Sequence, residues 1–252
     1  EVWENDFNDV NVSQMLARYG ALPEKIEYAW QVRRSVYDEI LLKHALELGV
    51  SVRRGQRAVS IMEKANRVTG AVVEDRNGVK GGIECEFLAD CSGQSGFLSR
   101  FKRIREYNPS LKNVAAYSYF KGAPWKYRFT GHPDKTKIFI CSVGCGWFWY
   151  IPVSSDVVSV GLVTATEHVK KSGADLRDIY WKELKACGEI WPLLKAASLI
   201  KDYEGTGKDF FTQSDWSYLN VASSGPGWLA AGDAAVFVDP ILSSGVTLAH
   251  IN

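Results

Sequence analysis

The segment Trp228-Leu229-Ala230-Ala231-Gly232-Asp233-Ala234-Ala235, close to the end of the chain, decides the fold. Its apolar first half predicts a buried strand, and Gly232-Asp233 predicts a turn directly after that strand. A short acidic side chain at a strand end can accept hydrogen bonds from a polyol. The small residues after it let a ligand lie against the backbone. The alternative is a plain turn with an exposed Asp233 that binds nothing.

A second turn follows the first within a few residues. Asp239-Pro240 is followed by Ser243-Ser244-Gly245, where a terminal helix is expected to begin. The unpaired N–H groups and the positive dipole end of a helix start suit an anion. The alternative is an ordinary serine cap with no ligand.

Upstream of these turns, strand and helix patterns interleave. Ser35 and Asp38 have the spacing of a capping box with Ser35 at the N-cap, and Gly49 ends the helix that follows. A second helix is expected over 175–187, and Pro192 opens a short third one. Arg76-Asn77-Gly78 predicts a hairpin turn within a three-stranded meander. Strands are expected over 50–52, 58–62, 68–74, 83–89, 115–120, 137–143, 147–151 and 157–163. This mixture predicts an α/β or α+β protein.

The composition excludes several classes of protein. The 252 residues carry 30 Lys+Arg against 29 Asp+Glu, which argues against binding to nucleic acid or membranes by bulk charge. No apolar run approaches the ~20 residues that span a bilayer. Five unpatterned cysteines indicate a reduced, cytoplasmic protein. The aromatic content of 12% favours a pocket for a flat ligand, with a tryptophan-rich core as the alternative.

Trp147 and Trp149 stand two apart in a predicted strand, so both side chains are expected on one face. Ile151-Pro152 follows them directly. Taken alone, the pair is also compatible with ordinary packing of aromatic side chains in a strand.

Three segments together resemble the flavin-dependent halogenases of the tryptophan halogenase superfamily. They are Gln31 to Asp38, Trp147 to Pro152, and Gly232 to Val246, and the resemblance runs from about Tyr28 to Asn252. Trp-x-Trp-x-Ile-Pro is the most specific piece, because it separates halogenases from the aromatic hydroxylases of the same FAD fold group. The resemblance implies a glutathione-reductase-like FAD-binding fold with a mainly antiparallel substrate-side sheet from about 112 to 165. The expected domains are a partial FAD-binding domain (1–111), a substrate-side region (112–220) and a return to the FAD-binding domain (221–252).

The resemblance also assigns roles to single residues. Asp233 would hold the ribityl chain of FAD, and the loop Asp90-Cys91-Ser92-Gly93 would approach its adenosine portion, although a plain tight turn explains that loop as well. Trp147 and Trp149 would keep the substrate away from the flavin. The remaining implied contacts are Arg34 near the cofactor (or Arg33 in its place), Pro240 and Gly245 at the cofactor, and the amides of Ser244 and Gly245 at the halide.

The activity implied is halogenation of an electron-rich ring in secondary-metabolite or antibiotic biosynthesis. A separate flavin reductase would supply reduced FAD, and oxygen and chloride or bromide would give hypohalous acid. Tryptophan halogenases carry a glutamate where this chain has Leu242, so a phenol or pyrrole substrate is expected, free or on a carrier protein. Two alternatives stay open. They are an FAD-dependent aromatic hydroxylase, which would share Asp233 and Pro240 without needing the two tryptophans, and a non-catalytic FAD-fold binding module.

Two expected features are missing from the chain. No Gly-x-Gly-x-x-Gly follows a strand, and the family's essential lysine lies upstream of the region matching Glu1. The sequence therefore reads as an internal fragment that is a poor enzyme alone. Cys141-x-x-x-Cys145 and four scattered histidines predict no metal site. The basic cluster of Lys102, Arg103 and Arg105 is expected to be a solvated face.

Overall fold

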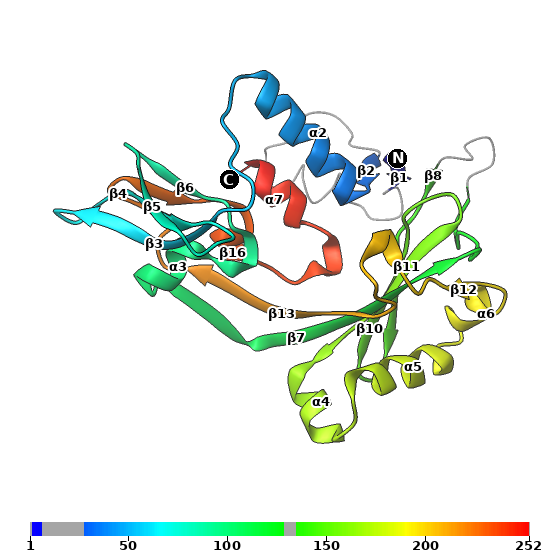
Figure 1. Ribbon diagram of the computed structural model, residues 1–252. Helices are drawn as coiled ribbons and strands as arrows, with labels where there is room; N and C mark the ends of the chain where they lie inside the picture. The colour runs from blue at the N-terminus through cyan, green and yellow to red at the C-terminus, as the bar shows by residue number, and fades with distance from the viewer. Residues whose placement is uncertain (1, 7–27, 129–134, 252) are drawn as a thin grey trace, which may run out of the picture. The chain divides into compact units, whose positions relative to one another are not determined.

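The computed structural model describes residues 2–6, 28–128 and 135–251 (Figure 1). The chain divides into two compact units, which are described separately. Unit 1 comprises Glu1–Val50 and Val114–Gln213, and unit 2 comprises Ser51–Asn113 and Ser214–Asn252. The domain limits expected from the sequence, 1–111, 112–220 and 221–252, stay a prediction for the whole protein.

Unit 1 contains the antiparallel sheet that was expected between 112 and 165, and this prediction is confirmed. Strand β10 (Gly146–Pro152) pairs antiparallel with β11 (Val157–Ala165) on one side and with β9 (Phe139–Val143) on the other. Strand β7 (Arg105–Lys121) lies next to β11, and the short β12 (Ser198–Leu199) pairs with β7.

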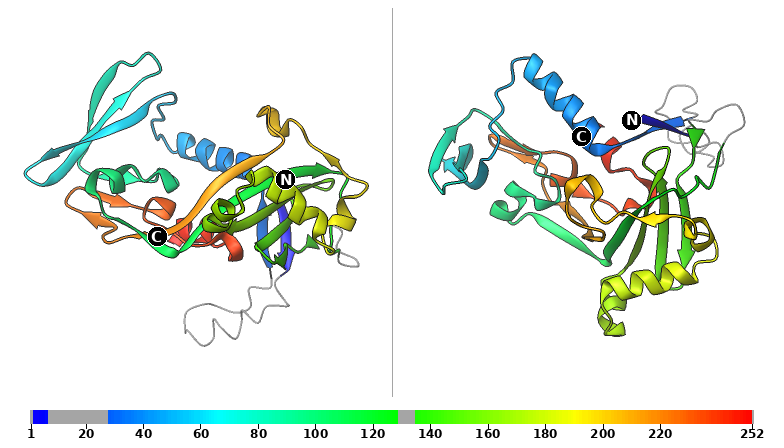
Figure 2. Two further views of the ribbon diagram at one scale, coloured as in Figure 1. Left: turned by 90° about the horizontal axis from the view of Figure 1, so that it is seen from below. Right: turned by 45° about the vertical axis from the view of Figure 1, so that its right-hand side comes forward.

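One face of this sheet is covered by helices. Helix α5 (Leu176–Ala186) lies against β11 in the views of Figures 1 and 2, and the short α6 (Trp191–Leu194) follows it. Both helices were predicted. Asp175 caps α5 by accepting a hydrogen bond from the Arg177 amide. Helix α4 (Thr166–Ser172) connects β11 to this layer. The buried core between sheet and helices includes Phe148, Tyr150, Val158, Val160, Leu162, Ile179, Tyr180, Leu184 and Leu194.

Helix α2 (Arg34–Glu47) is also in unit 1, and its predicted cap is wrong. The N-cap is Arg33, which makes no side-chain cap hydrogen bond, so Ser35 already lies inside the first turn. The chain enters the helix early because β2 (Tyr28–Val32), which pairs antiparallel with β1 (Val2–Asp6), leaves one residue before the first turn. The Ser35 hydroxyl donates to Glu204 instead. Strand β8 (Lys135–Thr136) adds parallel to β1.

Unit 2 contains the predicted meander of β3 (Arg57–Lys64), β4 (Arg67–Glu74) and β5 (Lys80–Glu84). The hairpin turn forms as expected, with Gly78 in the left-handed region at φ +81°. The strand predicted at 50–52 is wrong, because this exposed segment has no neighbouring strand to pair with in the described chain. The strand predicted over 83–89 is two separate strands, β5 and β6 (Leu88–Asp90).

The second sheet of unit 2 joins distant parts of the chain. Strand β15 (Trp228–Ala230) pairs parallel with β6 and antiparallel with β14 (Ser224–Gly225). Helix α3 (Phe97–Lys102) packs through Phe97 and Leu98 into the core formed with Val68, Trp228, Ala230, Ala234 and Ala235. Strand β13 (Phe211–Asn220) pairs with β16 (Val236–Phe237), and the terminal helix α7 (Gly245–Ile251) forms as predicted.

Candidate functional site

Two loops meet at one edge of the parallel strand pair in unit 2. Strands β6 and β15 run side by side, with Ala230 opposite Asp90 at their ends. The carboxyl ends of neighbouring parallel strands lie at the same edge of a sheet, which is where ligands of α/β folds bind. The 3-10 turns η1 (Gly93–Ser95) and η3 (Gly232–Ala234), which follow the two strands, therefore contact each other.

Asp90 holds the first of these loops together from the inside. Its side chain is buried, and its two oxygens accept the Ser92 amide at 2.9 Å and the Leu98 amide at 2.6 Å. The sequence predicts only close backbone approach at this loop, and the role of the carboxylate was not predicted. The signal was present, because an aspartate whose side chain can accept the amide two residues on, here that of Ser92, is typical of an Asx turn.

The second loop is held by side chains of β13. The Tyr218 hydroxyl donates to the Asp233 carbonyl, and the Asn220 amide nitrogen donates to the Ala234 carbonyl at 2.9 Å. Gly232 has φ +56°, and a Cβ at this position would lie 3.1 Å from the Ala249 Cβ of α7. The backbone around the half-buried Asp233 is therefore fixed, and helix α7 packs closely against it.

The structure brings Asp233 and Gly245 together. A Cβ added to Gly245, the first residue of α7, would lie 3.9 Å from the Asp233 Oδ1. The Ser244 carbonyl accepts the Leu248 amide at 2.9 Å and so starts the helix. Pro240 opens the 3-10 turn η4 (Pro240–Leu242).

Asp239 anchors the segment between these residues. Its Oδ1 accepts the Ile241 amide at 3.0 Å, and its Oδ2 accepts the Asn113 side-chain amide at 3.1 Å. The predicted residues Asp233, Pro240, Ser244 and Gly245 therefore lie within one unit. Hydrogen bonds to the backbone near Asp233 and to the Asp239 side chain hold the segment that carries them.

This arrangement fits a polyol-bearing cofactor such as FAD. A carboxylate stands next to a glycine that has no side chain to block approach, at the edge formed by two parallel strand ends. Asp233 would accept hydroxyl hydrogen bonds there, and the Gly245 backbone would line the same place.

In unit 1, Trp147 and Trp149 lie on one face of β10, as their spacing predicts. Phe148 and Tyr150 point to the opposite face and are fully buried in the core under α5. The two indole rings are 6.1 Å apart, and the Trp149 Nε1 donates to the Ser159 hydroxyl at 3.1 Å.

Gly161 of β11 determines how Trp149 lies. It stands opposite Trp149 in the antiparallel register, and a Cβ at this position would overlap the indole ring. Because Gly161 has no side chain, the indole crosses the β11 backbone and reaches Tyr117 on β7, with ring centroids 5.6 Å apart. The role of Gly161 was not predicted from the sequence.

Further aromatic rings lie next to Trp147 and Trp149. We call the surface that these rings and the two tryptophans form together the aromatic face. Tyr117 stacks on Phe211 with centroids 5.2 Å apart, and Tyr119 stacks on Tyr203 at 3.5 Å. Burial raises the pKa of Tyr117, Tyr119 and Tyr203 above the ordinary value of a phenol, so these side chains are neutral at physiological pH. The aromatic face comprises Tyr117, Tyr119, Trp147, Trp149, Tyr203 and Phe211. Such a surface can stack against a flat ring.

Arg34 lies elsewhere in unit 1, on α2. Its Nε and Nη2 donate to the two carboxylate oxygens of Asp38, each at 3.0 Å, and Arg33 donates to Glu204 at 2.8 Å. To bind a phosphate group, Arg34 would therefore have to give up its ion pair with Asp38 on the same helix.

The other sequence candidates behave differently. In the described ranges, no group of three or more His, Cys, Asp and Glu side chains could hold a metal ion. The Cys141 Sγ lies 3.6 Å from the Cys187 Sγ, and burial raises the pKa of Cys141 to about 11. Within the same described residues, no helix is long and apolar enough to cross a bilayer.

The basic cluster is not a uniform solvated face, which corrects the sequence interpretation. Lys102 forms an ion pair with Glu63, and Arg103 is exposed. Arg105 is partly buried, with its guanidinium carbon 3.7 Å from the ring centroid of Tyr218.

The fold has counterparts among known flavoproteins. The solved structure of the myxobacterial chondrochloren halogenase CndH, described as a variant of FAD-dependent halogenases, superposes with a TM-score of 0.79 at 29% identity. That match covers 91% of this chain and 51% of the other. The class is therefore the FAD-binding α/β fold of the flavin-dependent halogenases.

The chain belongs to the tryptophan halogenase family, whose sequence profile matches residues 5–252. It is 34% identical to the Tryptophan 2-halogenase of Chondromyces crocatus, covering 89% of this chain and 42% of that protein. It is 31% identical to the Sulochrin halogenase gedL of Aspergillus terreus, covering 89% of this chain and 44% of that protein. The chain thus spans less than half the length of these two relatives.

Proposed function

We propose that the protein containing this chain is a flavin-dependent halogenase that uses reduced FAD, oxygen and chloride or bromide. The observation that carries the proposal is the aromatic face, on which Trp149 lies across Gly161 next to Trp147. Membership of the family and the placement of Asp233 beside Gly245 support it.

The residues of this chain would bind and separate the reactants. Asp233 would accept hydrogen bonds from the cofactor's polyol chain, with Pro240 and Gly245 lining the same place. The amides of Ser244 and Gly245 would hold the halide, which would bind weakly because a helix-start contribution is only ~0.3–1 kcal/mol. Trp147 and Trp149 would exclude the organic ring from the place of oxidation by their bulk. Oxygen would oxidise the halide to hypohalous acid, and reduced FAD would supply the other two electrons for the reduction of oxygen, whose second atom leaves as water.

The proposed substrate class rests on Leu242, which stands where tryptophan halogenases carry a glutamate. A ring attacked by hypohalous acid must lose a proton, and an electron-rich phenol or pyrrole does so without a nearby carboxylate. We therefore propose a phenol or pyrrole, free or attached to a carrier protein. A separate flavin reductase in the cytoplasm would deliver the reduced cofactor.

The test is a product assay with the full-length protein. Reduced FAD, oxygen, bromide or chloride, and matched phenol, pyrrole and indole substrates are supplied, and products are identified by mass spectrometry. A halogenated phenol or pyrrole is expected in excess over halogenated indole. Halogenated tryptophan as the main product would overturn the substrate class and retain the activity.

The hydroxylase alternative predicts a different result in the same assay. It requires oxygenated rings in the absence of halide, at a rate that halide does not change. The binding-module alternative predicts FAD or ring binding with no turnover of either kind.

A further inference from the structure

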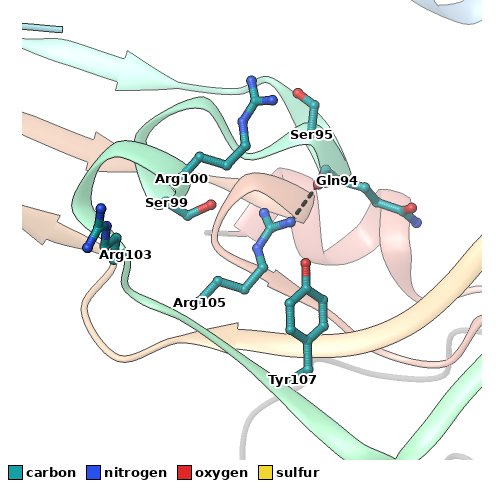
Figure 3. Close-up of a pocket in the computed structure, with 7 residues that line it drawn as sticks. All are labelled: Gln94, Ser95, Ser99, Arg100, Arg103, Arg105 and Tyr107. Atoms are coloured by element: carbon teal, nitrogen blue, oxygen red, sulfur yellow. Dashed lines mark hydrogen bonds between the residues drawn. The ribbon is translucent and has the colours of Figure 1, made fainter. Parts of the chain in front are cut away.

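Unit 2 contains a cavity of about 380 Å³ that none of the roles above uses. It is formed by the loop after β6, by α3 and by the start of β7 (Figure 3). Its lining residues include three arginines and no acidic residue. The lining residues are Gln94, Ser95, Ser99, Arg100, Arg103, Arg105 and Tyr107.

Arg105 is a partly buried cation in this lining. Its Nη1 donates to the Gln94 carbonyl at 2.6 Å, and its guanidinium lies against the Tyr218 ring. Its Nε and Nη2 are buried and have no hydrogen-bond partner within the described chain. Buried guanidinium N–H groups are normally paired, and among the described residues no carboxylate forms an ion pair with Arg105.

The local backbone is shaped to accommodate this side chain. Gly96 has φ +54°, and a Cβ at this position would overlap the Arg105 guanidinium. An alanine there would therefore be excluded twice, by backbone conformation and by space. The glycine lets the cation lie directly against the loop.

Arg100 and Arg103 add two more charges at the rim. Both are exposed, and among the described residues neither forms an ion pair, whereas their neighbour Lys102 pairs with Glu63. Arg103 adopts φ +55° at the end of α3, a conformation that is uncommon for a residue with a side chain. Three cations placed together repel one another unless an anion joins them.

We propose that this cavity binds the phosphate group of a phosphate ester. Guanidinium groups match phosphate oxygens in a bidentate way, and a doubly charged phosphate compensates more of the lining charge than a halide or a single carboxylate. Figure 3 shows the Arg105 guanidinium next to the Gln94 backbone carbonyl and near the Tyr107 hydroxyl, which is a further donor. The Ser95 and Ser99 hydroxyls already donate to backbone carbonyls at 2.7 and 3.0 Å.

Two sources of such a phosphate are compatible with the proposed function. One is the ADP half of FAD, and the other is the phosphopantetheine arm of a carrier-bound substrate. The inference does not require halogenation, because binding can be measured with no reductant, oxygen or halide turnover.

The experiment is a calorimetric titration of the full-length protein with inorganic pyrophosphate, ADP and 4′-phosphopantetheine, at low ionic strength. The variant Arg100→Gln/Arg103→Gln changes only exposed side chains, and Arg105→Lys keeps the buried charge while removing the fork. Each is expected to weaken binding of the preferred probe about tenfold or more. Arg76→Gln, an exposed arginine of the same unit outside the cavity, is the matched control and is expected to leave affinity unchanged.

Competition with FAD identifies the source. If ADP and FAD exclude each other and all three cavity arginines affect both, the phosphate is that of the cofactor. If phosphopantetheine binds to FAD-saturated protein with the same arginine dependence, the phosphate belongs to a carrier-bound substrate. The proposal is overturned if no probe binds at millimolar concentration, or if the double variant binds every probe as the control does.

Discussion

Asp90 stabilises the loop after β6 through its buried side chain. Its buried carboxylate satisfies two backbone amides of the loop after β6, whereas the sequence suggested only a small-residue turn. The burial of a carboxylate depends on which strand lies beside it, and β15 is more than a hundred residues away. Local sequence could identify the turn but not the environment of its aspartate.

Asp90→Ala is expected to lower the free energy of unfolding by about 3 kcal/mol, because two charge-assisted hydrogen bonds are lost and the buried Leu98 amide is left unpaired. The measurement is a denaturant titration. Asp75→Ala is the matched control, since Asp75 also accepts two backbone amides, at 2.8 and 2.9 Å, but in an exposed hairpin. An equal loss in both variants would contradict the role given to burial.

Gly161→Ala is expected to displace the Trp149 indole and to destabilise unit 1 by ~1–3 kcal/mol, because the added methyl group overlaps the ring. Tryptophan fluorescence would shift along with the denaturation midpoint. Gly144→Ala serves as the control, as a Cβ at that position meets nothing within 4 Å. An unshifted spectrum for Gly161→Ala would mean that Trp149 does not lie across β11.

Asp233→Ala in the full-length protein is expected to weaken FAD binding roughly tenfold to a hundredfold, since a charge-assisted hydrogen bond contributes ~1.5–3 kcal/mol. Fluorescence titration with FAD measures this. Asp239→Ala is a poor control because it anchors the neighbouring segment, whereas Asp156→Ala, on an exposed loop of unit 1, is a suitable one. Unchanged FAD affinity would remove Asp233 from the cofactor site.

Elements were predictable where their pattern is local. The alternation of β10 correctly placed Trp147 and Trp149 on one face, and the meander was recognised from a turn and flanking strands. The start of α2 was misplaced because Ser35, the first residue of the Ser-x-x-Asp spacing, is the second residue of the helix and donates a hydrogen bond to Glu204 instead of capping. The short segment at 50–52 has strand-forming residues but no partner strand in the described chain, so its propensity is not realised.

The aromatic face was predicted only in part for a related reason. Trp147 and Trp149 are recognisable from one strand, while Tyr117, Tyr119 and Phe211 come from β7 and β13. Their proximity depends on the order of strands in the sheet, which hydrophobic periodicity does not contain.

At the scale of the whole molecule, buried phenols are expected to make the folded protein less stable at alkaline pH. Burial raises the pKa of Tyr119, Tyr150 and Tyr180 in the folded protein, while unfolding returns each phenol to a pKa of about 10. Their contribution is therefore fully present below about pH 10 and is lost as the pH rises above it, because the unfolded state then releases more protons.

Denaturant midpoints between pH 7 and pH 11 test this dependence. These phenols are expected to cause no change in the midpoint below pH 9 and to lower it above pH 10. Tyr119→Phe keeps the ring and removes one titrating group, so its midpoint should fall less steeply. An identical slope in the variant would contradict the assignment of Tyr119 as a buried phenol.

The central claim is that the aromatic face keeps the organic ring away from the place of oxidation, so that halide reacts first. The most direct measurement is the ratio of halogenated ring to released hydrogen peroxide during reoxidation of FAD by the full-length protein. The variant Trp147→Leu/Trp149→Leu is compared with wild type, and Trp216→Leu, which lies on β13 in unit 2, is the control. We predict that the double variant reoxidises FAD at a similar rate, halogenates slowly and releases peroxide, while the control behaves as wild type. An unchanged product ratio in the double variant, or wild-type protein that hydroxylates the ring equally well without halide, would contradict the account.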